Sequence, residues 1–212
     1  MQPDFWHRRW ENNQIGFHNS ETHPMLPAHF ENLAVPQGGR VFVPLCGKTL
    51  DIHWLLANFY RVVGAELSRI AIEQLFQELG LEPVIAADGA HQRFSADGID
   101  IFVGDIFDLT AEKIAPVDAI YDRAALVALP RPLRDRYARH LAALAPAARQ
   151  LLITFDYDQS RMDGPPFAVS PEECLEHYRG SYDVRLLSID PVPGGLKGVC
   201  EATESTWLLT PR

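Results

Sequence analysis

The sequence predicts an α/β fold with a doubly wound, mostly parallel sheet, and two patterns in the chain support this class. First, short apolar runs rich in β-branched residues recur along the chain, separated by segments whose apolar residues have helical spacing. Second, the last two such runs are separated only by a stretch rich in proline and glycine, which indicates an antiparallel hairpin. The length fits one domain, residues 1–212, without an internal linker.

The first half of the chain supplies two clear strands, each followed by a helix. Residues 40–45 form the first predicted strand, and residues 50–59 follow it with apolar positions at helical spacing. Residues 61–67 form the second strand. Ser68 then occupies the N-cap position of a helix that ends at Gly80, a residue suited to the left-handed conformation of a helix C-terminus.

The second half continues the alternation and brings the number of predicted strands to seven. The further strands are expected at residues 99–103, 117–121, 151–155, 182–189 and 204–209, and helices at 133–144 and 170–178. Ser170 precedes a proline and two glutamates, which is a strong signal for a helix start.

Charge and composition narrow the range of partners. A formal net charge of −9 and a pI near 5.3 are unfavourable for binding phosphate backbones or anionic lipid, so neither nucleic acid nor a membrane is expected as a partner. Three cysteines without a CxxC pair indicate neither a disulfide framework nor a thiolate zinc site. Without a signal peptide, a membrane span or a long apolar stripe, we expect a cytoplasmic monomer.

Ligands of open α/β sheets bind beyond the carboxyl ends of the strands, so the residues at those ends are the candidates for function. These residues are Leu45, Cys46, Gly47, Glu66, Asp105, Ile106, Asp122, Arg123, Asp156 and Tyr157. For Asp156 and Tyr157 we expect a place in the wall of a substrate cavity, beneath the proline-containing loop at residues 164–167. A plain rigid turn explains those prolines equally well.

The turn after the first strand indicates a nucleoside without a pyrophosphate. The Gly-Lys-Thr at residues 47–49 lacks the earlier glycine of a phosphate-binding loop, and the dinucleotide pattern G-x-G-x-x-G is absent. Glu66 ends the second strand at the spacing of an acid that accepts hydrogen bonds from both ribose hydroxyls. The alternative is a salt-bridged carboxylate at a strand end. Asp105 and Ile106 are candidates for holding an adenine, against the alternative of a simple turn.

The amino-terminal segment, residues 1–35, is expected to form a helical lid. Phe5, Trp6, Trp10 and Phe17 lie among polar residues there, and an aromatic face could cover a ligand and contact a sulfonium cation. A helix that simply packs on the sheet explains the same pattern. Metal binding by His18 and His23 is disfavoured, because their spacing belongs to a loop rather than to one helix face. For Cys46, packing beside the ligand is favoured over a nucleophilic role.

Five motifs together resemble the thiopurine S-methyltransferase family. They are VPLCGK at 43–48, VGAE at 63–66, DIFDL at 105–109, YDRAALVA at 121–128 and DGPPF at 163–167. An amino-terminal W-x(5)-G-F-H at 10–18 is also similar to that family, and the resemblance extends over residues 6–209. The short segment that precedes these motifs is similar to bacterial members.

The resemblance implies a class I methyltransferase fold (Rossmann-like), with a mostly parallel seven-stranded sheet, helices on both faces and S-adenosylmethionine as the cofactor. The residues that it implies for cofactor contact are Trp10, Leu45, Glu66, Ile106 and Arg123, with Asp105 through its backbone. Phe17 matches an aromatic residue on the substrate side of the lid. The implied substrates are aromatic and heterocyclic thiols such as thiopurines, and for some bacterial members selenium or tellurium compounds.

Two points stay open at the level of the sequence. Arg123 is permanently charged and could favour a thiolate, whereas the resemblance places it against the cofactor, and the two roles are compatible. Vertebrate members of the family carry an arginine-containing loop before the last strand, but residues 191–198 here contain Lys197 as their only charge. The rival hypotheses are a non-catalytic S-adenosylmethionine-binding sensor and an NAD-dependent oxidoreductase.

Overall fold

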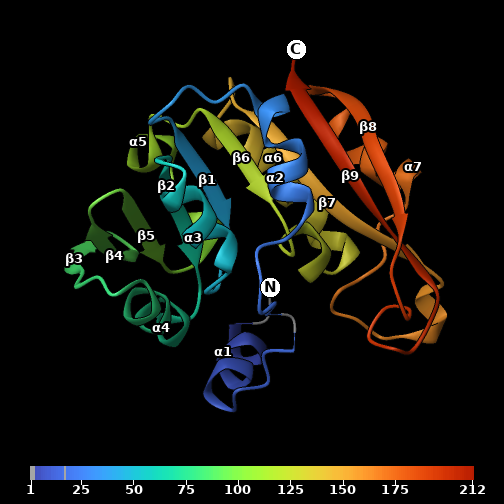
Figure 1. The fold of residues 1–212 in the computed structure, drawn as a ribbon, viewed down its shortest axis with the longest axis horizontal. Helices are drawn as coiled ribbons and strands as arrows, with labels where there is room; N and C mark the ends of the chain where they lie inside the picture. Colours follow the sequence, from blue (N-terminus) through green and yellow to red (C-terminus); the bar gives the residue numbers. More distant parts are fainter. Residues whose placement is uncertain (1–2, 17) are drawn as a thin grey trace.

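The computed structural model describes residues 3–16 and 18–212, and nine strands within them form one sheet (Figure 1). The strands are β1 (Arg40–Pro44), β2 (Arg61–Glu66), β3 (Val84–Asp88), β4 (His91–Ala96), β5 (Ile99–Val103), β6 (Ala119–Asp122), β7 (Arg149–Tyr157), β8 (Tyr182–Pro191) and β9 (Ala202–Pro211). Their order across the sheet is β3-β4-β5-β2-β1-β6-β7-β9-β8. Each of the seven strands expected from the sequence is present in this sheet.

The centre of the sheet is parallel. β5, β2, β1, β6 and β7 pair with one another in the same direction, and β9 is inserted antiparallel between β7 and β8. The expected count of seven strands is too low for the whole sheet, because β3 and β4 extend it as an antiparallel hairpin beside β5. β3 contains a short apolar run, residues 84–87, that was not assigned to a strand, and β4 is mostly polar and lacks the apolar pattern of the central strands.

Helices cover both faces of the sheet. The α-helices are α1 (Pro3–Glu11), α2 (Met25–His29), α3 (Leu50–Ala57), α4 (Arg69–Leu79), α5 (Ala111–Ile114), α6 (Arg131–Leu144) and α7 (Pro171–Tyr178). Short 3-10 turns are η1 (Phe30–Leu33), η2 (Ile106–Asp108), η3 (Leu126–Ala128) and η4 (Gln159–Arg161). Apart from α1, which lies beside α4 at one edge of the view, these helices pack on the sheet (Figure 1).

Alternation along the central strands builds two apolar cores. In β1, Val41 and Val43 contribute to the core beneath α2, α3 and α4, whereas Phe42 contributes to the core beneath α5, α6 and α7. Side chains of a strand point to opposite faces in turn, so a strand buried on both faces is a continuous apolar run. This explains why the central strands were predictable from sequence.

The predicted helix boundaries follow the expected capping chemistry. Ser68 Oγ accepts a hydrogen bond from the Ala71 amide at 3.3 Å, and Gly80 ends α4 in the left-handed conformation with φ of 67°. Ser170 Oγ accepts from the Glu173 amide at the start of α7. Across the described residues, no helix combines the length and the apolarity that crossing a bilayer requires.

Candidate active site

A cavity of about 220 Å³ opens at the carboxyl ends of β1, β2, β6 and β7. Residues from α1 and the loop after it, from the turns that follow β1, β2 and β6, and from loops at residues 165–166 and 196–197 line this cavity. They are Trp6, Arg9, Trp10, Gly16, His18, Asn19, Leu45, Cys46, Gly47, Lys48, Thr49, Glu66, Leu67, Arg123, Ala124, Val127, Ala128, Ile153, Phe155, Pro165, Pro166, Leu196 and Lys197. The cavity therefore lies where ligands of open α/β sheets are expected.

Glu66 is the acidic residue of this cavity, and it is 6% exposed. Its Oε2 accepts a hydrogen bond from the Gly47 amide at 2.8 Å, and its Oε1 accepts from the Ser68 amide at 2.8 Å. Burial raises the pKa of Glu66, and the amides of Ser68 and Gly47 partly offset that rise. An ionised carboxylate offers about four acceptor positions, so the backbone amides leave it some capacity to accept hydrogen bonds from a ligand.

The turns that follow β1 and β6 each contain a non-glycine residue in the left-handed region. Leu45, after β1, has φ of 46°, and Ala124, after β6, has φ of 61°. Non-glycine residues in the left-handed region cost of order 1–3 kcal/mol each and cluster at functional sites. Both residues line the cavity. The strain thus lies in the two turns that form its floor.

Helix α1 closes one side of the cavity. Trp10 is 5% exposed, and its ring lies so near Gly47 that a Cβ on that glycine would be 3.1 Å from the indole Cζ2. Gly47 also has φ of 50°, so a side chain there would be strained in conformation as well as crowded. Trp6 and Arg9 contribute further lining from the same helix.

The segment after α1 is anchored to the sheet. The His23 amide donates to Asp51 Oδ1 at 2.7 Å, and His23 Nε2 lies 3.1 Å from Glu204 Oε1. Leu26 and Phe30 are buried in the core on that face. Among the described residues of the expected lid, 1–35, those that line the cavity all precede His23.

Arg123 follows β6 and lines the cavity beside Ala124. Within the described part of the chain, Arg123 forms no ion pair with a carboxylate. Its charge is therefore available to a ligand, because a guanidinium stays protonated across the accessible pH range.

The turn that carries Arg123 is held by a fully buried carboxylate. Asp122 Oδ1 accepts from the Leu126 amide at 3.1 Å, and its Oδ2 accepts from the Tyr137 hydroxyl at 2.8 Å and from Gln150 Nε2 at 3.3 Å. Burial raises the pKa of Asp122 to about 6, despite these donated hydrogen bonds. The network fixes the backbone from which Arg123 enters the cavity.

This raised pKa predicts a specific pH dependence of stability. The folded state holds a proton on Asp122 up to about pH 6, whereas the unfolded chain releases it near 3.8, so stability falls as the pH rises between these values. Because each pKa unit is worth about 1.4 kcal/mol, the loss by pH 7 is roughly 3 kcal/mol. Asp122→Asn, which carries no charge, should remove this pH-dependent component of the stability.

Urea unfolding of the wild type and of Asp122→Asn at intervals from pH 4 to pH 7 checks this prediction. The difference in unfolding free energy between the two proteins should change from pH 4 to about pH 6 and then level off. A constant difference would contradict the assignment of the titration to Asp122.

Asp105 and Ile106 lie in the turn that follows β5, but they are not among the residues that line the cavity. Asp105 Oδ1 accepts from the Phe107 amide at 3.0 Å and so caps η2, and the Asp105 carbonyl lies 3.0 Å from His91 Nε2. Ile106 is fully buried, and its carbonyl lies 2.7 Å from His140 Nε2. The structure therefore gives both residues local structural partners, and their contact with an adenine stays a prediction.

Asp156 and Tyr157 also lie outside the lining of this cavity. The expected strand ends at residue 155, but β7 continues to Tyr157, so both residues belong to the strand rather than to the loop beyond it. They border a second, more open hollow beside residues 191–203. Phe155 lines the first cavity, and contact of Asp156 and Tyr157 with a substrate stays a prediction. Phe17 lies outside the described residues.

Sequence reasoning missed several basic cavity residues. His18, Arg9 and Lys197 line the cavity, although they come from a loop, from α1 and from the stretch before β9. Burial, followed by nearby Lys48, lowers the pKa of His18. Burial and nearby Arg9 lower the pKa of Lys197, whose Nζ donates to the Pro165 carbonyl at 2.7 Å. For Lys197, the sequence signal was that it is the single charged residue of segment 191–198.

Comparisons with known proteins point in one direction. A family model described as thiopurine S-methyltransferase matches residues 1–210. A protein named thiopurine S-methyltransferase from Xanthobacter autotrophicus (strain ATCC BAA-1158 / Py2) is 59% identical over 210 residues, which cover 99% of each chain. One of the same name from Pseudomonas fluorescens (strain Pf0-1) is 46% identical over 194 residues, 92% of this chain and 89% of that one.

Solved structures agree on the fold. A Burkholderia thailandensis 1,6-didemethyltoxoflavin-N1-methyltransferase with bound 1,6-didemethyltoxoflavin and S-adenosylhomocysteine superposes with a TM-score of 0.68 at 16% identity, over 98% of this chain and 87% of that one. The complex of DhpI with S-adenosylhomocysteine gives a TM-score of 0.59 at 18% identity, over 100% of this chain and 96% of that one.

Proposed function

The chain belongs to the thiopurine S-methyltransferase family, and from this premise we propose that its cavity binds S-adenosylmethionine and transfers the methyl group to a small thiol. The observation that carries the proposal is the placement of Glu66. Its carboxylate lies at the end of β2 in the cavity wall, beside the left-handed Gly47, with capacity left to accept hydrogen bonds from a ligand. Two ribose hydroxyls match that arrangement.

The residues around Glu66 fit the remainder of the cofactor. Gly47 allows close approach of the backbone, and the Trp10 ring above it offers an aromatic face to a positively charged sulfur. Leu45 and Arg123 complete the proposed contacts within the cavity, and Ile106 and the Asp105 backbone are proposed to hold the adenine end. When bound, S-adenosylmethionine supplies a methyl group on a sulfonium, which a thiolate attacks directly.

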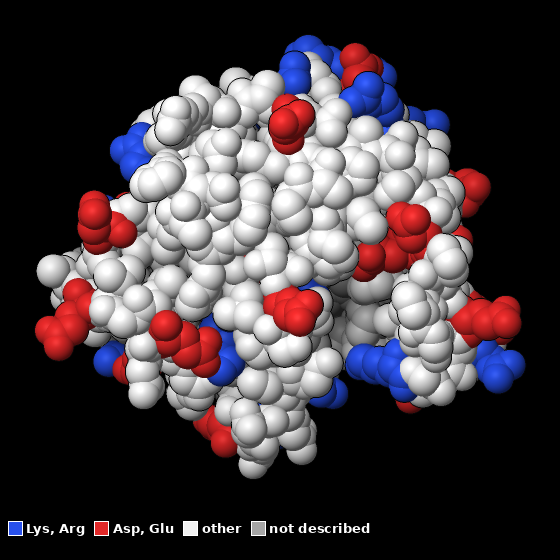
Figure 2. Space-filling view, viewed as in Figure 1, with Lys and Arg blue, Asp and Glu red and all other residues white. Residues whose placement is uncertain are grey.

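The cavity is suited to keeping a thiol in its anionic form. Among the described residues that line it, Arg9, Lys48, Arg123 and Lys197 are basic, and Glu66 is acidic. This contrasts with the protein as a whole, whose net charge is −9, and with the face in Figure 2, where charges are scattered around a largely uncharged middle. A nearby positive charge lowers the pKa of a thiol, which raises the fraction of the reactive thiolate.

The chain's own contribution to the reaction is therefore positioning and charge. Holding two reactants in line supplies roughly 7–11 kcal/mol of the barrier to a bimolecular reaction. Arg123 faces the cavity and is proposed to favour the thiolate, the cofactor's carboxylate, or both. The part of the chain before His23, with Phe17 on the substrate side, is proposed as the lid that excludes water.

For the substrates we propose aromatic and heterocyclic thiols such as thiopurines, in line with the names of the relatives. Selenium or tellurium compounds, and a part in detoxification, are a further proposal. We propose a single-domain monomer of the cytoplasm without nucleic acid or membrane partners. A non-catalytic sensor of the same cofactor and an NAD-dependent oxidoreductase are the disfavoured alternatives.

Ligand-induced thermal shift followed by a methyl-transfer assay tests the proposal. S-adenosylhomocysteine at a hundredfold its Kd should stabilise the protein by about 2.7 kcal/mol, whereas NADH should have no effect. Radiolabelled methyl from S-adenosylmethionine should then appear in a thioether product when a panel of thiols is supplied. Stabilisation without transfer to any thiol would favour the sensor, and no stabilisation would refute the cofactor site.

A further inference from the structure

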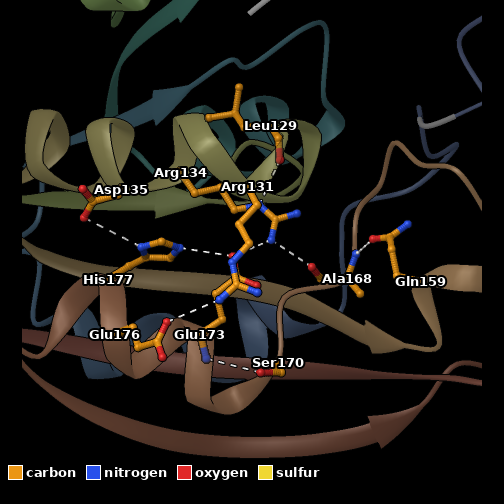
Figure 3. Close-up of polar contacts among 10 residues, drawn as sticks. All are labelled: Leu129, Arg131, Arg134, Asp135, Gln159, Ala168, Ser170, Glu173, Glu176 and His177. Atoms are coloured by element: carbon orange, nitrogen blue, oxygen red, sulfur yellow. Dashed lines mark hydrogen bonds and ion pairs between the residues drawn. The ribbon is translucent and has the colours of Figure 1, made fainter.

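A buried arginine joins α6 to two segments outside the helices (Figure 3). The Arg134 side chain is 3% exposed, and its Nη1 lies 2.6 Å from Glu173 Oε1 on α7. Its Nε donates to the Leu129 carbonyl and its Nη1 to the Ala168 carbonyl, both at 2.9 Å. One guanidinium thus bonds to three separate parts of the chain.

The helix pair alone does not require this arrangement. Burying two charges costs several kcal/mol per ion, and a well-packed apolar pair of similar volume is often at least as stabilising. α6 and α7 are also linked at the surface, where Arg131 lies 3.6 Å from Glu176. The buried guanidinium also donates hydrogen bonds to two backbone carbonyls in loops. Its N–H groups are held in one plane in a fixed arrangement, which suits bonding to several acceptors at once.

Both of these loops form part of the cavity wall. Leu129 follows η3, whose residues Val127 and Ala128 line the cavity. Ala168 follows Pro165 and Pro166, which also line it. The ring of Phe167, the residue between, lies 5.8 Å from the guanidinium carbon of Arg134.

Further hydrogen bonds fasten the same two loops to each other and to the sheet. The Phe167 amide donates to the Val127 carbonyl at 2.7 Å, and the Val169 amide donates to the Phe155 carbonyl at 2.7 Å. The Tyr157 hydroxyl donates to the Pro166 carbonyl at 2.7 Å. Through this bond Tyr157 supports the part of the wall at residues 165–166.

We propose that Arg134 is a positioning residue for the thiol substrate, fixing the spacing between residues 127–128 and residues 165–166 across the cavity. The inference rests on the proposed function, which assigns the end of the cavity at Glu66 to the cofactor. The wall held by Arg134 lies at the ends of β6 and β7, away from that carboxylate. Glu173 orients the guanidinium and is itself shared with His177, whose Nε2 lies 3.2 Å away.

The test separates substrate positioning from general folding. Arg134→Lys keeps the charge beside Glu173 but lacks the fork that reaches both carbonyls. With 6-mercaptopurine as the probe thiol, its kcat/KM should fall about 10- to 100-fold, mainly through KM for the thiol, as expected when a wall shifts by about an ångström. The Kd for S-adenosylhomocysteine, measured by calorimetry, should stay within about twofold of the wild type, because Glu66 is untouched.

Two further variants make the outcome decisive. Arg131→Ala removes the exposed ion pair between the same two helices and should leave both KM and Kd unchanged. Tyr157→Phe removes the bond to the Pro166 carbonyl without disturbing a buried charge, and should raise KM for the thiol in the same direction by a smaller factor.

The possible results are distinct. Equal loss of thiol and cofactor binding in Arg134→Lys, or the same change in Arg131→Ala, would overturn the positioning role. If Arg134→Lys does not fold, an unchanged KM in Tyr157→Phe would overturn it. Failure of the wild type to bind S-adenosylhomocysteine would instead refute the proposed function itself.

Discussion

Replacing Glu66 with glutamine is expected to raise the Kd for S-adenosylhomocysteine roughly 10- to 100-fold. Hydrogen bonds to a charged group contribute about 1.5–3 kcal/mol, and each 1.4 kcal/mol is a factor of ten in Kd. The glutamine side chain has no charge. Its NH₂ group also faces one of the two backbone N–H groups, those of Gly47 and Ser68, that now donate to the carboxylate. Ribose binding and the turn after β1 are therefore weakened together.

Isothermal titration calorimetry measures this effect directly. Glu73→Gln is the matched control, because it removes an exposed carboxylate of α4 that pairs with Arg69 and does not border the cavity. Burial raises the pKa of Glu66, so lowering the pH should protonate this carboxylate more readily than an exposed one. The affinity of the wild type for S-adenosylhomocysteine should therefore weaken at acidic pH. If Glu66→Gln bound with wild-type affinity, the ribose assignment would be lost.

Replacing Arg123 with methionine is expected to lower kcat/KM about 10²- to 10³-fold, the loss seen when one preorganised electrostatic contact to a reacting group is removed. Stability should change by no more than about 0.5 kcal/mol, since the side chain is partly exposed. If Arg123 favours the thiolate, the variant should reach its best rate at a higher pH, because the thiol then ionises without help.

Steady-state rates from pH 6 to pH 9, together with the Kd for S-adenosylhomocysteine, distinguish the two roles of Arg123. A shifted pH profile with unchanged Kd places its action on the thiol, and a weakened Kd with an unshifted profile places it on the cofactor. Arg212→Met, which removes an exposed arginine paired with Asp183, serves as the control. Unchanged rates at every pH would remove Arg123 from the site.

Most of the sheet could be predicted from the sequence because its central strands are buried on both faces. Val41 to Val43 and Leu151 to Ile153 are continuous apolar runs for that reason, with neighbours assigned to opposite cores. β3 and β4 were not predicted. β3 has only a four-residue apolar run and forms an exposed edge, and β4, which pairs with it, is mostly polar.

The residues of the site also divide into those that the sequence could predict and those that it could not. Glu66 and Arg123 were predictable because Glu66 ends a strand and Arg123 follows one, and the sheet itself brings strand ends together. Lys197 and Arg9 reach the cavity through a late loop and the first helix, whose positions are set by tertiary packing. Arg134 lies in a helix rich in arginine, where charge usually indicates a solvated face, and its burial depends on Glu173 from a different helix.

Cys46 shows how a site that handles sulfur nucleophiles keeps its own sulfur inactive. Its side chain is almost fully enclosed in the cavity wall, and burial together with the nearby Glu66 charge raises its pKa well above the ordinary value. A thiol that stays protonated is a poor acceptor for an alkyl group and a poor target for oxidants. We therefore expect Cys46 to stay unmethylated during turnover, beside a cofactor that alkylates sulfur.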